Sequence, residues 1–110
     1  MKRKIEDALF SIGVPASYKG FRYIVDAVLI LNMFPEYKMT DIYSKIGKIR
    51  NVTASSVERD IRHAFFVCRK GCNQKEINHY IGSDHTTNKD SIYHLYMIIK
   101  REVEDENGNY

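Results

Sequence analysis

The chain has 110 residues, of which 44% are hydrophobic and 28% are charged, and its net charge is +3 at pH 7. This length predicts one domain, and the apolar fraction is enough for a single hydrophobic core. No segment approaches the roughly 20 apolar residues of a membrane span. The start, MKRKIEDALF, has neither the apolar stretch nor the small-residue cleavage site of a signal peptide. We therefore expect a cytoplasmic protein with no membrane contact.

Apolar residues recur at helical spacing through most of the chain, without the alternation that is typical of strands. We predict an all-α fold with about six helices in one compact domain. The predicted helices cover residues 2–12, 18–33, 40–50, 54–70, 73–81 and 89–103. The domain is expected to span residues 1–104, and residues 105–110 are expected to form an acidic, frayed tail. Helix 18–33 is strongly apolar, so we expect it at the centre of the core.

The segments that separate the later helices contain residues typical of helix ends. Gly71 is expected to end helix 54–70 in the left-handed conformation that glycine often adopts there. Asn73 and Glu76 have the spacing of a capping box at the start of the next helix. Residues 83–88 are polar and predict a loop.

Residues 43–70, YSKIGKIRNVTASSVERDIRHAFFVCRK, have the pattern of a helix-turn-helix: a short helix, a tight turn and a longer helix. Asn51 lies at the turn, and Asn is among the few non-glycine residues that tolerate the left-handed conformation. Thr53 suits the N-cap, because its hydroxyl can accept a hydrogen bond from the first turn. Gly47 is small enough to let the second helix cross closely. We therefore expect a helix-turn-helix at about residues 40–70.

The longer helix of this motif has one apolar side and one basic side when residues are placed about 100° apart. The apolar side, which we expect to be buried, contains Val57, Ile61, Ala64, Phe65 and Cys68. The polar side, which we expect to be exposed and positive, contains Ser55, Arg59, Arg62, Phe66 and Arg69. An ordinary amphipathic helix with a solvated cationic face has the same pattern, so both interpretations stay open on the pattern alone.

Three apolar residues are expected to pack between the two helices of the motif: Ile46, Ile49 and Val52. Arg50 and Asp60 occupy positions that are usually apolar in helix-turn-helix sequences. We expect Ile49 and Ile61 to take over these positions through a one-residue rotation of each helix.

Basic residues are concentrated in the same segment of the chain. Residues 38–70 carry eight basic and three acidic side chains, whereas residues 71–110 carry four basic and seven acidic ones. A phosphate backbone would be attracted to this distribution. Because the charge pattern and the helical pattern are independent, their agreement favours nucleic-acid binding more than the net charge does.

The remaining reactive residues do not predict a catalytic or metal site. Cys68, Cys72 and His79 form a C-x3-C-x6-H string with no convincing fourth zinc ligand, so we expect two reduced thiols and no metal. Glu58 and His63 lie five residues apart on one helix and point in different directions. The other histidines, His79, His85 and His94, are scattered. We therefore predict that the protein is not an enzyme, has no catalytic residue and needs no cofactor.

The last predicted helix has apolar residues outside its main apolar side. Tyr93, Met97 and Ile98 lie there, while Ile92, Leu95 and Ile99 lie on the main side. The extra residues are explained either by core packing on a second side or by contact with a second copy of the chain.

Three blocks of the chain resemble a known family. They are IGVPASYKGFRYIVDAV at residues 12–28, TASSVERDIRHAF at residues 53–65 and the weaker TTNKDSIYHL at residues 86–95. They are similar to the C-terminal DNA-binding (effector) domain of the sporulation response regulator, stage-zero sporulation protein A. The second block is the most specific, because it matches the family's recognition helix.

The resemblance implies a six-helix domain with a central helix-turn-helix that binds double-stranded DNA at a promoter box. It also implies tandem copies on DNA, which would form a homodimer, and contact with the sigma subunit of RNA polymerase. The residues expected to read bases are Arg59, Arg62, Glu58 and Ser55. The residues expected to contact the DNA backbone are Thr53, Ser56, His63, Lys45, Lys48, Arg69 and Lys70. Contact between copies would use Tyr93, Met97 and Ile98.

Two departures from the family pattern leave a second function open. Ser56 stands where the family typically has Arg, which removes one cationic contact. The chain also has no room for the receiver domain that normally precedes this one, so it is either an excised domain or a natural stand-alone version. The alternative is a receiver-less protein-interaction module that dimerises with a full-length regulator or antagonises it.

Overall fold

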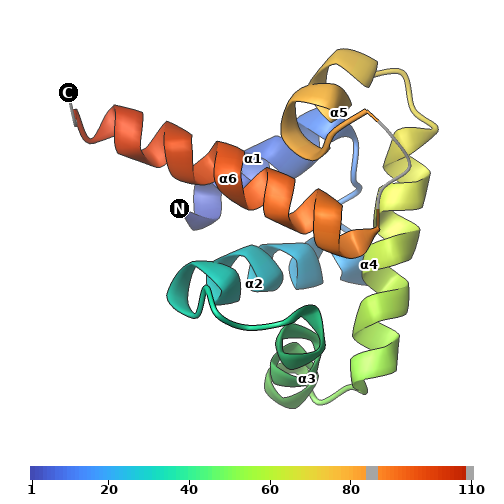
Figure 1. Ribbon diagram of the computed structural model, residues 1–110. Helices are drawn as coiled ribbons and strands as arrows, with labels where there is room; N and C mark the ends of the chain where they lie inside the picture. The colour runs from blue at the N-terminus through green and yellow to red at the C-terminus, as the bar shows by residue number, and fades with distance from the viewer. Residues whose placement is uncertain (84–86, 109–110) are drawn as a thin grey trace.

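The computed structural model describes residues 1–83 and 87–108, and helices account for all of the regular structure in these ranges (Figure 1). The helices are α1 (Lys2–Ile12), α2 (Lys19–Met33), α3 (Met39–Arg50), α4 (Ala54–Arg69), α5 (Gln74–Ile81) and α6 (Asn88–Glu106). The prediction of an all-α domain with six helices is therefore confirmed. Each helix within the described ranges is too short or too polar to span a bilayer.

Helix α2 lies at the centre of the core, as its apolar sequence predicts. Nine of its fifteen residues are buried: Gly20, Phe21, Tyr23, Ile24, Val25, Ala27, Val28, Ile30 and Leu31. Helices α1, α3, α4 and α6 all pack against α2, and α5 packs mainly against α1 and α6. Figure 1 shows α2 enclosed by these helices, with α4 along one edge of the molecule. One face of α4 is therefore supported by the core and the opposite face is free.

Gly20 allows the start of α2 to lie directly against α4. A Cβ atom at this position would lie 2.3 Å from the carbonyl oxygen of Asp60 and 2.8 Å from Cβ of Ala64. Both distances are shorter than real contacts, and the first atom belongs to the backbone, which cannot move aside without shifting α4. The sequence pattern did not identify this close approach.

Two of the expected helix ends are wrong in detail. Positive φ angles in the described part of the chain are found at Asn51, Gly13, Gly82 and Gly108, so Gly71 does not adopt the left-handed conformation. The Asn73 side chain makes no cap hydrogen bond to α5. It donates instead to the carbonyl oxygen of Ser11 at 3.0 Å and so ties the start of α5 to the end of α1.

Helix α6 is longer than the pattern predicts at both ends. Asn88, which was expected in a loop, is its first residue, and Thr87 caps it by accepting the backbone N–H of Asp90 at 3.2 Å. The helix continues through Glu106, whose carboxylate pairs with Lys4 of α1. This pair supports a last helical turn in a segment that was expected to be frayed.

Candidate nucleic-acid interface

The turn between α3 and α4 has the predicted left-handed residue at Asn51, with φ 59° and ψ 48°. The backbone N–H of Val52 donates to the carbonyl oxygen of Gly47 at 2.9 Å and closes the turn. A Cβ atom at Gly47 would lie 2.7 Å from the carbonyl oxygen of Val52. Gly47 is therefore needed for the tight turn itself, as well as for the approach of the two helices.

The start of α4 is capped by Thr53, as predicted. Its hydroxyl accepts the backbone N–H of Ser56 at 3.1 Å and donates to the Ser56 hydroxyl at 2.8 Å. These bonds satisfy one of the free N–H groups of the first turn and orient two hydroxyl groups at the exposed end of the helix.

The expected packing between α3 and α4 is correct for Ile46 and wrong for Ile49. Ile46 and Ile61 are fully buried, but Ile49 is 59% exposed. The position that Ile49 was expected to fill belongs to Arg50, whose guanidinium donates to both carboxylate oxygens of Asp26 at 2.9 Å. This pair gives Arg50 a polar partner on α2, so α3 does not rotate.

The two sides of α4 separate as predicted over most of its length. Its buried residues are Val57, Ile61, Ala64, Phe65 and Cys68. Ser55, Arg59, Arg62 and Phe66 are exposed on the other side. The free face of α4 therefore begins at the turn and presents hydroxyl and guanidinium groups to solvent.

The two arginines of this face have side chains that are each 63% exposed. Arg62 Nη1 donates to both carboxylate oxygens of Glu58 at 2.5 and 2.7 Å. Arg59 Nε lies 3.6 Å from a carboxylate oxygen of Asp60. Exposed pairs of this kind contribute little stability. The guanidinium groups are therefore oriented by carboxylates and remain available to a stronger acceptor.

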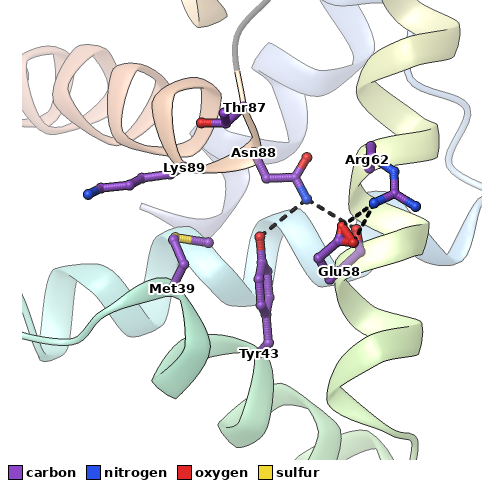
Figure 2. A pocket seen from close by; sticks show the side chains of 7 residues that line it. All are labelled: Met39, Tyr43, Glu58, Arg62, Thr87, Asn88 and Lys89. Carbon is purple, nitrogen blue, oxygen red and sulfur yellow. Dashed lines mark hydrogen bonds and ion pairs between the residues drawn. The ribbon is translucent and has the colours of Figure 1, made fainter.

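A shallow pocket of about 390 Å³ borders this face where α3, α4 and the start of α6 meet (Figure 2). Asn88 lies at its centre and donates to the Tyr43 hydroxyl at 3.2 Å and to the Glu58 carbonyl oxygen at 3.1 Å. Burial raises the pKa of Tyr43, so its hydroxyl keeps its proton. This network holds the start of α6 beside α4, and the sequence pattern did not reveal it.

On the other side of the free face, His63 stacks on Tyr18, with ring centroids 5.6 Å apart and planes at 18°. Tyr18 is the residue before α2. The free face of α4 therefore lies between the start of α6 on one side and the start of α2 on the other.

The three lysines that were expected to contact a DNA backbone have different surroundings. Lys70 Nζ lies 4.2 Å from the ring centroid of Phe66, and Lys45 Nζ lies 5.3 Å from that of Phe34. Lys45 and Lys48 also border a hollow that contains two carboxylates, Glu36 and Asp41. Lys70 continues the free face of α4, whereas Lys45 and Lys48 belong to a more neutral surface.

Arg69 is turned toward the inside of the domain, unlike the other arginines of α4. Its Nη1 donates to the carbonyl oxygen of Gly82 at 2.9 Å, and its Nη2 donates to the Ser91 hydroxyl at 2.8 Å. The side chain thus links α4 to the end of α5 and to α6. It was expected to contact a DNA backbone, and this position does not favour that role.

The chain matches the model of one known protein family over most of its length. The family model described as "Sporulation initiation factor Spo0A C terminal" matches residues 5–101. The chain belongs to this family. A Spo0A C-terminal domain is the DNA-binding domain of a sporulation regulator, so this protein is a DNA-binding regulatory domain. The free face of α4 is accordingly its candidate DNA-binding surface.

The residues expected at a contact between Spo0A-type domains do not form one exposed patch. Met97 is 52% exposed, but Ile98 is half-buried. Tyr93 is also half-buried, and its hydroxyl donates to the carbonyl oxygen of Tyr37 at 3.3 Å. Core packing therefore accounts for much of this second apolar side of α6.

The cysteines and histidines are dispersed over the domain. Cys68 is buried and Cys72 is exposed, and both are free thiols. His85 lies outside the described residues. Within residues 1–83 and 87–108, no group of three His, Cys, Asp or Glu side chains is placed to hold a metal ion.

Proposed function

We propose that this protein is a sequence-specific transcription regulator whose helix α4 enters the major groove at a promoter box. The observation that supports this most is the exposure of Arg59 and Arg62 on the one face of α4 that the core leaves free. A guanidinium group can donate two hydrogen bonds to guanine O6 and N7, which contributes about 1–3 kcal/mol of discrimination.

The other groups on this face have complementary roles in the proposed complex. Glu58 orients Arg62, with which it already pairs, and can accept a hydrogen bond from a cytosine amino group. Ser55 is exposed beside the arginines and reaches base edges. The DNA backbone is contacted by the cap hydroxyls of Thr53 and Ser56, by His63 and by Lys70, which continues this face. Such contacts set the register without carrying sequence information.

The proposed partners beyond one duplex are a second copy of the domain on a tandem box and the sigma subunit of RNA polymerase. The exposed thioether of Met97 is the part of the expected contact that a second copy could reach. A Met97→Lys variant should bind a single box normally and lose cooperative binding to a tandem pair. Unchanged cooperativity would show that copies meet elsewhere or bind independently.

Selection of bound duplexes from a random pool tests the main proposal. One motif should emerge, and Arg59→Ala with Arg62→Ala should remove the preference for it in a gel-shift assay. The matched control is Arg3→Ala with Arg101→Ala, which removes two exposed arginines from α1 and α6. An unchanged preference in the α4 variant would contradict base reading by these arginines. No shift of any duplex at low salt would favour the alternative of a protein-interaction module.

A further inference from the structure

A groove of about 320 Å³ runs beside the helix-turn-helix, between the start of α2 and the turn that precedes α4. Ser17, Lys19 and Arg22 line it from α2 and the segment before it, and Arg50 and Val52 line it from the turn side. Arg22 and Arg50 also border a second hollow that extends toward Lys2 and Glu6 of α1. We call the first of these the α2 groove.

Two contacts hold the α2 groove in a fixed position relative to α4. Gly20 brings the backbone of α2 against Asp60 and Ala64, and Tyr18 stacks on His63. Lys19 and Arg22 flank Gly20 in sequence and are both exposed. The groove therefore begins where the free face of α4 ends, on the side of His63.

Two of the three cations that line the α2 groove, Lys19 and Arg22, are not paired with a carboxylate in the described part of the chain. Asp26 lies four residues after Arg22 on α2 and would be its usual helical partner. Both oxygens of Asp26, however, accept hydrogen bonds from Arg50. In the described part of the chain, neither Lys19 nor Arg22 makes an ion pair, and the acidic residues that line the adjoining hollow are Asp26 and Glu6.

We propose that the α2 groove binds the phosphate backbone of the duplex just outside the box, with Lys19 and Arg22 as its phosphate contacts. This role depends on α4 entering the duplex as we propose. A duplex that binds the free face of α4 extends beyond the base pairs that α4 contacts. On the side of His63, this extension would lie next to the α2 groove and its cations Lys19 and Arg22. Contacts of this kind add affinity and set register, and they do not read sequence.

Lys19→Ala with Arg22→Ala tests the α2 groove, with Lys75→Ala and Arg101→Ala as a control that removes the same charges from α5 and α6. Binding of each chain to a selected box duplex is measured by fluorescence anisotropy at several salt concentrations. The α2 variant should bind roughly tenfold more weakly, with a log K against log salt slope smaller by about 1.8. Its ratio of box to random-duplex affinity should stay unchanged. Ethylation of phosphates should interfere at flanking positions in the unaltered chain and not in the α2 variant.

The possible failures have different meanings. If the unaltered chain prefers its box and both charge variants weaken binding equally, the α2 groove does not contact DNA while the regulator function stands. A changed box preference in the α2 variant would also overturn a phosphate role and indicate base contact. If the unaltered chain binds no duplex, the α2 groove proposal and the proposed function fail together.

Discussion

Arg50 of α3 and Asp26 of α2 form a two-bond ion pair, in which Nε to Oδ2 and Nη2 to Oδ1 are both 2.9 Å apart. The pair connects the helix that precedes the turn to the central helix of the core. It also determines which cations near the turn remain unpaired, because Asp26 is the neighbour that Arg22 would otherwise use. One ion pair therefore links the geometry of the turn to the charge of the α2 groove.

Removing this pair should have a measurable and specific cost. Arg50→Met should lower the free energy of unfolding by about 1 kcal/mol, because the bonds are charge-assisted but partly exposed. A double-mutant cycle with Asp26→Asn, followed by urea denaturation, isolates the coupling between the two side chains. A coupling near zero would show that the pair contributes nothing to the position of α3.

Gly20→Ala should destabilise the fold far more than an ordinary glycine replacement in a helix. The added Cβ would overlap the backbone oxygen of Asp60 and force α2 away from α4, at a cost of about 1–3 kcal/mol. Gly71→Ala is the comparison, because its Cβ would meet one backbone oxygen, that of Cys68, at 3.2 Å. Thermal unfolding followed by circular dichroism measures both. Equal melting temperatures would contradict the tight α2–α4 contact.

Arg69 and Arg59 should respond in opposite ways to the same replacement. Arg69→Met removes hydrogen bonds to Gly82 and Ser91 and should cost about 2 kcal/mol of stability, with no change in the salt dependence of DNA binding. Arg59→Met should change stability by less than about 0.5 kcal/mol and reduce box preference. Urea denaturation and anisotropy on both variants make the comparison. A smaller salt dependence of DNA binding in Arg69→Met would instead show that Arg69 contacts the DNA backbone, as the resemblance implies.

The two cysteines should differ in reactivity and in their effect on stability at high pH. Burial raises the pKa of the Cys68 thiol to about 11, so an alkylating reagent at pH 8 should modify Cys72 alone in the folded protein. The unfolded chain releases this proton near its ordinary pKa of 9.0. Stability should therefore fall by roughly 1–2 kcal/mol as the pH rises from about 9 to about 11. In Cys68→Ala this part of the pH dependence, measured by urea denaturation, should be absent.

Glu58→Gln should separate specificity from affinity. It removes a negative charge from the proposed DNA-binding face and weakens the hydrogen bonds from Arg62 to both Glu58 oxygens. Binding to random duplex should strengthen, whereas the preference for the box should fall by about tenfold. Competition assays measure the two affinities, and Glu104→Gln on α6 serves as the control. A preference that survives in Glu58→Gln would show that Arg62 is positioned without its carboxylate.

Features that depend on neighbouring residues along the chain could be predicted from the sequence. The left-handed Asn51, the Thr53 cap and the buried side of α4 follow from backbone sterics and helical periodicity, and the structure has all three. The exposure of Arg59 and Arg62 follows from the same periodicity. That these two side chains contact bases remains a prediction.

Features that depend on distant residues could not be predicted in this way. Ile49 was expected inside because it is apolar, but Asp26 lies 24 residues from Arg50 and stabilises the polar alternative. Helical periodicity places Arg69 on the same side of α4 as the exposed Arg59 and Arg62. Its side chain turns inward instead, because its hydrogen-bond partners lie 13 and 22 residues away. Asn73 was assigned to a local cap and bonds instead to Ser11, 62 residues earlier. In each case a long-range polar partner overrides the local pattern.

The ion pair between Lys4 and Glu106 has a practical consequence for experiments on this protein. It joins the first helix to the last turn of α6, and in Figure 1 the start of α1 and the last turn of α6 lie on the side of the molecule opposite α4. A fluorophore, affinity handle or surface tether attached at the start of α1 or in the last turn of α6 would thus lie away from the exposed face of α4. Protein that is immobilised or labelled at these positions should therefore keep the exposed face of α4 unobstructed.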